Sequence, residues 1–182
     1  MLALVAQLNV VSALGALISQ VAAVVLIALL VQRRISGATS PILSLVGSYG
    51  IHLVFLISIA GTALSLTYSE VFGFVPCGLC WLQRIFLYPM VILSGLALWK
   101  RDRSIADYLI ALSIPGMIVA LYQHYLQLGG SNLVGCPVAG FGADCAKRIL
   151  FEFGYITFPL VAFSAFVLIA TVAYTIRSQK SL

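Results

Sequence analysis

Two cysteines, Cys77 and Cys80, stand at the start of a long apolar run and are well placed to do chemistry. A thiol at the N-terminus of a helix lies close to free backbone N–H groups and to the positive end of the helix dipole, which favour the thiolate. Arg84 follows Cys80 by one helical turn, so its positive charge is expected beside the Cys80 sulfur. Because the thiolate exchanges disulfides and reduces oxidants, this arrangement predicts a redox site.

A second pair of cysteines, Cys136 and Cys145, lies in a glycine-rich stretch between two apolar runs. Flexible glycines would let their Cα atoms approach to within the ~4.4 to 6.8 Å that a disulfide requires. A thiol–disulfide relay needs one anchored pair and one mobile pair, because a thiolate must approach a disulfide in line. The two pairs therefore predict such a relay, with a lipophilic electron acceptor for the pair that faces lipid.

The composition places these cysteines in a membrane protein. Of the 182 residues, 62% are hydrophobic and 8% are charged, and the mean hydropathy is +1.12. No soluble domain has such a composition. The net charge of +5 could suggest nucleic-acid binding, but the Lys and Arg residues lie mainly between apolar runs, where they set membrane topology. We predict an all-α membrane protein without a nucleic-acid partner.

Five apolar segments are long enough to cross about 30 Å of hydrocarbon as helices. The first lacks the basic start and the short apolar core of a cleaved signal peptide, so we predict that it stays on the protein. The predicted spans are residues 2–31, 42–68, 77–99, 104–128 and 155–176.

Local signals mark the starts of two of these helices. Ser40 is expected as the N-cap of the second helix, with Pro41 at its first helical position. Ser104 and Asp107 have the spacing of a capping box for the fourth helix.

The basic residues predict the orientation of the chain. Seven of the ten lie on one side if the loops at 32–41 and 100–103 and the C-terminus are cytoplasmic. By the positive-inside rule, both cysteine pairs then face out of the cytoplasm. The seven are Arg33, Arg34, Lys100, Arg101, Arg103, Arg177 and Lys180.

Three motifs carry a resemblance to a known family. They are Cys77-Gly-Leu-Cys80-Trp81-Leu-Gln83-Arg84 followed by Tyr88-Pro89, then Tyr122-Gln123-His124, then Asp144-Cys145-Ala followed by Phe-Gly-Tyr-Ile-Thr-Phe-Pro. Over about residues 40–176 the chain resembles the DsbB/BdbC family of quinone-dependent membrane thiol oxidases. Its loop pair is more closely spaced than in the best-known members, as in the BdbC-type branch.

The resemblance implies a fold and a function. Residues 35–182 would form the family's four-helix transmembrane bundle with an outward loop at 129–154, and residues 1–34 would add an N-terminal transmembrane helix. In that family a soluble DsbA/BdbD-like thioredoxin-fold oxidase is reoxidised, and the electrons pass to a membrane quinone, which supports disulfide formation in exported proteins. The expected location is a bacterial cell membrane, with both cysteine pairs facing the periplasm or exterior and the C-terminus in the cytoplasm.

The resemblance also implies a role for each cysteine. The partner's thiol would attack Cys136, Cys145 would exchange with Cys77, and Cys80 would donate electrons to the quinone. The alternative for Cys136 and Cys145 is a purely structural disulfide, and the alternative for the other pair is that of small apolar residues.

Two further residues are implied in quinone binding, where the quinone is ubiquinone or menaquinone. Arg84 would lie beside it, and His124 would line its pocket. The alternatives are that Arg84 extends to the lipid headgroups and that His124 is an interfacial residue without a redox role.

Two other classes of protein fit part of the pattern. A vitamin K epoxide reductase-like enzyme also couples thiols to a quinone, but its Cys-X-X-Cys lies near the outer end of a late span. A structural zinc site with four thiolates is the non-enzymatic alternative, and the wide spacing of the second pair argues against it, so no metal site is predicted. A transmembrane carrier of reductant could use similar thiols with the opposite net flow.

Overall fold

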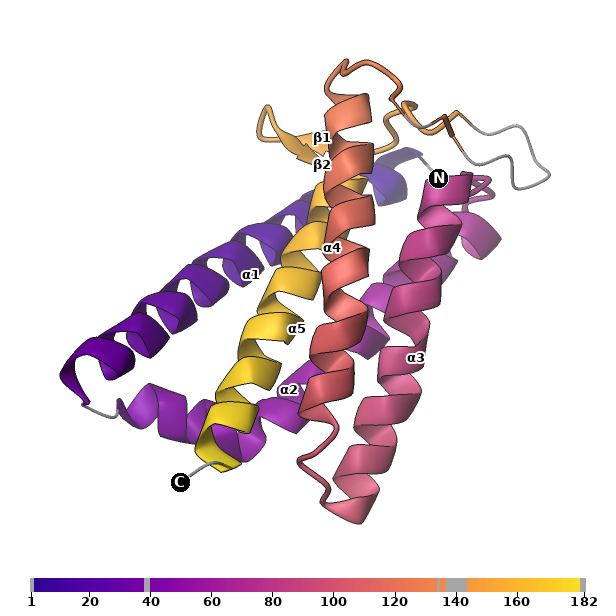
Figure 1. Ribbon diagram of the computed structural model, residues 1–182. Helices are drawn as coiled ribbons and strands as arrows, with labels where there is room; N and C mark the ends of the chain where they lie inside the picture. Colours follow the sequence, from indigo (N-terminus) through magenta and orange to yellow (C-terminus); the bar gives the residue numbers. More distant parts are fainter. Residues whose placement is uncertain (1, 38–39, 134, 137–143, 181–182) are drawn as a thin grey trace.

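The computed structural model describes residues 2–37, 40–133, 135–136 and 144–180, and these are mostly helical. Within them, five long helices run between the two ends of an elongated bundle (Figure 1). Each is long and apolar enough to span a membrane, which confirms the prediction of an all-α, multi-pass membrane protein. The helices are α1 (Leu2–Ser36), α2 (Pro41–Leu66), α3 (Gly78–Lys100), α4 (Ala106–Gln127) and α5 (Phe158–Lys180).

Helix α5 is the centre of the bundle. It packs against α4, α2 and α1, and it has the largest share of buried residues among the five spans. Phe166 of α5 is fully buried, and its ring lies over Gly116 of α4. A Cβ atom at Gly116 would come within 2.6 Å of that ring, so glycine is what allows the two helices to approach here.

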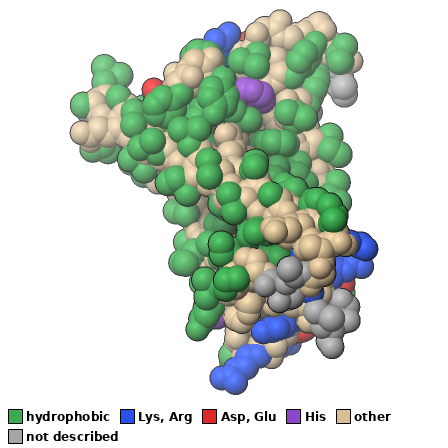
Figure 2. Space-filling view, turned by 90° about the vertical axis from the view of Figure 1, so that its left-hand side faces the viewer, with side chains coloured by type: hydrophobic (Ala, Val, Ile, Leu, Met, Phe, Trp, Pro, Cys, Tyr) green, Lys and Arg blue, Asp and Glu red, His purple; other side chains and the backbone are tan. Residues whose placement is uncertain are grey.

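The two ends of the bundle differ in charge. On the face shown in Figure 2, Lys and Arg side chains gather mainly at the lower end, which is the end of the C-terminus in Figure 1. Large hydrophobic side chains are exposed along α1, α2, α3 and α4, as expected of surfaces that face lipid. The first turn of α3 and the loop after α4 lie at the opposite, upper end, and they carry the cysteines.

The capping box predicted for α4 is wrong. The Ser104 backbone N–H and hydroxyl both donate to the Asp102 carboxylate, each at 2.8 Å, and the helix begins without a side-chain cap. Asp107 instead pairs with Arg177 of α5 at 3.0 Å. The turn before α4 offers Ser104 a nearer carboxylate, while Asp107 faces the neighbouring helix.

The upper end contains two elements that the sequence pattern did not predict. A π-helical turn, η1 (Thr67–Val71), extends α2 into the region expected to be a loop. A small antiparallel hairpin of β1 (Phe151–Glu152) and β2 (Ile156–Thr157) precedes α5, so α5 begins at Phe158 rather than Tyr155. Strands of two residues are too short to show a periodic pattern.

Candidate active site

Cys77 is the N-cap of α3 and Cys80 lies in its first turn. The Cys77 backbone is extended, and its sulfur accepts a hydrogen bond from the Cys80 N–H at 3.3 Å. A sulfur therefore occupies the capping position that a serine or aspartate oxygen usually fills. This places both sulfurs at the positive end of the helix dipole, as predicted.

The two sulfurs of this pair lie 2.7 Å apart and are not joined. The hydrogen bond between the Cys77 thiol and the Cys80 sulfur, together with burial, raises the pKa of Cys77. Cys77 therefore favours the thiol form, while the first-turn position of Cys80, at the positive end of the helix dipole, favours a thiolate there. A thiolate at Cys80 is the form that can reduce an electron acceptor.

Two glutamines complete the surroundings of this pair. Nε2 of Gln123, on α4, donates to the Cys77 sulfur at 3.1 Å and to the Cys80 sulfur at 3.3 Å. Its Oε1 accepts from Nε2 of Gln83 at 2.6 Å, which fixes the orientation of the Gln123 amide. Both side chains are buried, so their hydrogen bonds are little weakened by water.

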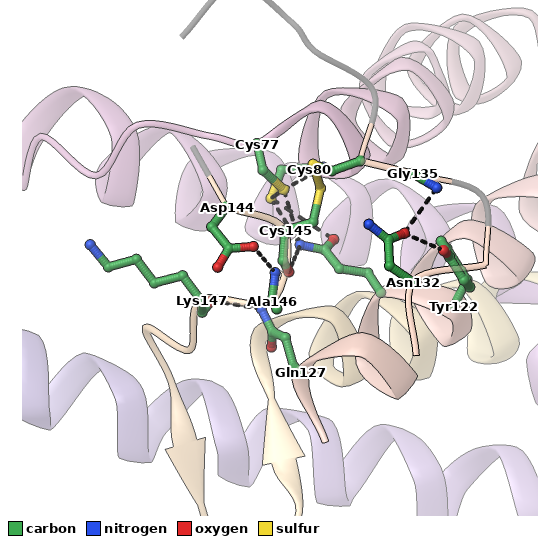
Figure 3. The surroundings of a disulfide bond; sticks show 12 residues. Cys77, Cys80, Tyr122, Gln127, Asn132, Gly135, Asp144, Cys145, Ala146 and Lys147 are labelled. Carbon is green, nitrogen blue, oxygen red and sulfur yellow. Dashed lines mark hydrogen bonds between the residues drawn. A yellow bond between two sulfur atoms is a disulfide. The ribbon is translucent and has the colours of Figure 1, made fainter. Parts of the chain in front are cut away.

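The loop cysteines are joined to each other and lie next to the helix pair (Figure 3). The disulfide links Cys136 to Cys145 with a Cα–Cα distance of 5.9 Å, which confirms the predicted pairing. Cys145 is buried in one cluster with Cys77, and its carbonyl accepts from Gln123 at 3.5 Å. The structure therefore brings all four predicted cysteines together, with the loop pair joined by a disulfide and the helix pair not bonded to each other.

A cavity of about 560 Å³ opens beside the helix pair, and residues of α2, η1, α3, α4, α5 and the loop that carries Cys145 line it. Both cysteines of the pair line it, and so does Arg84. Most of the remaining lining is apolar, including Leu64, Leu87, Phe158, Val161 and Phe166. An apolar cavity with a few polar groups at a reactive pair is typical of a small-molecule site.

Arg84 is held rigidly in this cavity wall. Its Nε donates to Ser65 Oγ at 2.9 Å, and its Nη2 donates to the Ser65 carbonyl at 3.0 Å. Its guanidinium also lies over the rings of Trp81, at 5.0 Å, and Tyr88, at 6.0 Å. The side chain is only 7% exposed, whereas an arginine that extends to the headgroups would be largely exposed.

His124 lies apart from this cavity. Its Nδ1 is 2.7 Å from the Thr157 hydroxyl of β2, and His124 is not among the described residues that line the cavity. The structure therefore places the predicted quinone ligand Arg84 beside the cysteines, but gives His124 a partner in the hairpin.

Gln123 and Gln83 are the residues that sequence reasoning overlooked as parts of the site. Both occur in the quoted motifs, but neither was given a role. A signal was present, because Gln123 and Gln127 lie one turn apart on one face of a mostly apolar helix. Polar side chains within a membrane span usually face a partner or a functional site.

Replacement of Gln123 by leucine is expected to slow alkylation of the reduced helix pair by about 10- to 100-fold at neutral pH, because a hydrogen bond to the Cys80 thiolate is lost. The measurement is the pH dependence of iodoacetamide labelling, with labelled cysteines identified by mass spectrometry. Gln179→Leu is the matched control, since it removes an amide that bonds to the Leu43 carbonyl at the other end of the bundle. An unchanged pH profile in Gln123→Leu would show that the amide does not stabilise the thiolate.

The fold and the site together define a class: a helical-bundle membrane protein with an exchangeable thiol–disulfide system at one end. The chain belongs to the DsbB family, because the family model for "Disulfide bond formation protein DsbB" matches residues 48–176. Helix α1 lies outside the matched residues. Membership implies a membrane thiol oxidoreductase that acts in disulfide bond formation.

Named relatives agree with this assignment. The chain is 43% identical to the SPbeta prophage-derived disulfide bond formation protein B of Bacillus subtilis over 130 residues, which are 70% of this chain and 86% of the relative. It is 34% identical to disulfide bond formation protein C of the same organism over 133 residues, 73% of this chain and 94% of the relative. A probable disulfide formation protein of Chlamydia trachomatis is 38% identical over 134 residues, 73% of this chain and 96% of the relative. No solved structure matches the chain.

Proposed function

We propose that this protein reoxidises a soluble thioredoxin-fold disulfide oxidase and passes the electrons to a membrane quinone. The observation that carries the proposal is the contact of two cysteine pairs, one joined by a disulfide and one not, beside an apolar cavity that contains a buried arginine. A thiol pair alone would serve many functions, but a largely apolar cavity at its sulfurs supports a lipophilic electron acceptor.

The residues of the cavity fit a quinone ring. The apolar side chains suit its faces, and Arg84 is a cation available to a ring oxygen. Gln127 also lines the cavity, and its Oε1 is buried without a hydrogen-bond partner among the described residues, so it can accept a hydrogen bond from a bound molecule. A bound quinone would accept two electrons and two protons.

The cysteines would act in the following order. A partner thiolate attacks Cys136, and the partner's second thiol completes its own disulfide and leaves both loop cysteines reduced. The Cys145 thiolate then attacks Cys77 of the oxidised helix pair and expels the Cys80 thiolate. Cys136 next attacks Cys145, which restores the loop disulfide and releases Cys77. The loop pair is then a disulfide again, and the helix pair holds two thiols that the acceptor would oxidise.

The charge distribution supports an orientation for this reaction. Basic residues at the end opposite the cysteines would lie in the cytoplasm of a bacterial cell, together with the C-terminus. Both thiol pairs would then face the periplasm or exterior, where exported proteins acquire disulfides.

The test mixes detergent-purified protein with a reduced thioredoxin-fold oxidase and a water-dispersible quinone. We expect catalytic loss of the quinone absorbance, and the loss should stop when either cysteine pair is replaced by serine. Ubiquinone and menaquinone analogues are compared in parallel to define the acceptor. Absence of turnover with both, although the loop disulfide is formed and accessible, would leave a structural disulfide on a DsbB-type fold.

A further inference from the structure

Helix α1 packs on the segment that follows Cys145. Its Ala13 and Ala16 are fully buried in a cluster with Leu150, Ile156 and Leu160, which belong to the hairpin region and to the start of α5. Helix α1, which lies outside the residues that the family model matches, therefore packs against the end of the molecule that carries the cysteines.

One buried side-chain amide of α1, that of Asn9, contacts both the loop after Cys145 and the wall of the cavity. Asn9 is only 9% exposed, and its Nδ2 donates to the Ile149 carbonyl at 3.4 Å. Its Oδ1 accepts a hydrogen bond from the Tyr68 hydroxyl. Ile149 lies four residues after Cys145, and Tyr68 lines the cavity, so Asn9 contacts both the redox loop and the cavity wall.

A second amide lies three turns along the same face of α1. Gln20 donates through Nε2 to the Ser164 hydroxyl of α5 at 2.9 Å. Its Oε1 accepts from the Tyr155 hydroxyl, in the turn of the hairpin, at 3.3 Å. Lipid can replace apolar contacts between helices, but it cannot replace such directed hydrogen bonds, so the two amides fix how α1 sits on the hairpin and α5.

The segment after Cys145 is thus held from two sides. On the side of α4, Gln127 donates to the Lys147 carbonyl at 2.9 Å. On the side of α1, Asn9 holds the Ile149 carbonyl. Cys145 stays buried against Cys77 between these contacts.

We propose that α1 is a brace that keeps Cys145 next to Cys77, with Asn9 as its principal positioning residue. This proposal rests on the proposed function, because attack of Cys145 on Cys77 is the internal step of the relay. In that step the Cys77–Cys145 bond forms, the Cys77–Cys80 bond breaks, and Cys80 leaves as a thiolate. The rate of this step depends on the effective concentration of the Cys145 sulfur at Cys77. A helix that holds the Cys145 segment in place raises this concentration without contacting the sulfur itself.

The test measures this effective concentration directly. In a Cys80→Ser, Cys136→Ser background, Cys77 and Cys145 are the remaining cysteines and can form only their mutual disulfide within one molecule. Purified protein is equilibrated with mixtures of reduced and oxidised glutathione, and the oxidised fraction is read by alkylation and mass spectrometry. Adding Asn9→Leu to this background is expected to lower the effective concentration of Cys145 at Cys77 about tenfold, which is the size of effect that the loss of interhelical hydrogen bonds gives.

Two further variants make the result specific. Tyr68→Phe removes the contact to the cavity wall but keeps the contact to Ile149, so a smaller decrease is expected. Ser19→Ala is the matched control, because its hydroxyl donates to the Gly15 carbonyl of the same helix, and it should change nothing. The thermal unfolding of each variant reports whether the bundle itself is intact.

An unchanged effective concentration in a folded Asn9→Leu variant would overturn the brace. An equal decrease in Ser19→Ala would also overturn it, because the effect would then not depend on the Asn9 contacts. The measurement uses neither quinone nor partner, so failure of the proposed electron transfer in the unmodified protein would be a separate result.

Discussion

Replacement of Cys80 by serine is expected to abolish quinone reduction while one round of exchange with the partner persists. Cys80 lines the cavity, and without its sulfur the helix pair cannot form the disulfide whose formation would release two electrons to an acceptor. The Cys136–Cys145 disulfide remains, so each molecule can still oxidise one partner dithiol. A stopped-flow record should therefore show a single stoichiometric burst of partner oxidation and no decay of quinone absorbance.

Cys136→Ser provides the complementary variant. It removes the disulfide that the partner attacks but leaves the helix pair and its cavity intact, so a small dithiol should still support quinone reduction although the partner does not. If Cys80→Ser continued to turn over with quinone, the assignment of Cys80 as the electron donor would be wrong.

Replacement of Arg84 by alanine is expected to raise the KM for quinone by roughly 10- to 100-fold, because a fixed cation in a cavity of low dielectric stabilises negative charge strongly. Partner oxidation in a single turnover should change little, since the contacts of Arg84 with described residues are to Ser65, Trp81 and Tyr88, which belong to α2 and α3. Arg84→Lys should recover only part of the loss, because an ammonium cannot reproduce the two-point contact with Ser65.

Arg148→Ala is the matched control for charge and for loss of an aromatic contact. Arg148 lies over the Phe151 ring at 4.9 Å at the same end of the molecule, but it is exposed and outside the cavity lining. Equal effects of Arg84→Ala and Arg148→Ala on quinone kinetics would show that the kinetics respond to the overall positive charge at this end of the molecule and not to a specific role of Arg84 in the cavity. Unchanged kinetics in Arg84→Ala would assign the arginine a purely structural role.

Much of the fold could be predicted because its signals are local. A membrane helix is defined by the length of its apolar run, and all five predicted spans correspond to helices. Ser40 accepts a hydrogen bond from the Ile42 N–H, and Pro41 is the first helical residue, as their types indicated. The position of Cys77 at the N-terminus of α3 is likewise predicted by a local signal, the start of the apolar run.

The contacts between distant segments could not be predicted in the same way. Gln83 and Gln123 meet because α3 and α4 pack together, and nothing in either segment specifies the partner of the other. The first span is predicted from sequence only as an additional transmembrane helix, because the roles of Asn9 and Gln20 depend on the position of the hairpin. The capping box failed for the same reason, because Asp107 found a partner on another helix.

The close contact between Gly116 and Phe166 has a consequence for how this family member could evolve. Phe166 lines the cavity, and Gly116 supports its ring without being part of the lining itself. Any larger residue at Gly116 must displace the ring, so the capacity of the cavity is controlled partly from a position in the neighbouring helix. If the cavity holds the proposed quinone, a lineage could therefore adapt it to a different acceptor at this position while the cysteines, the glutamines and Arg84 stayed unaltered.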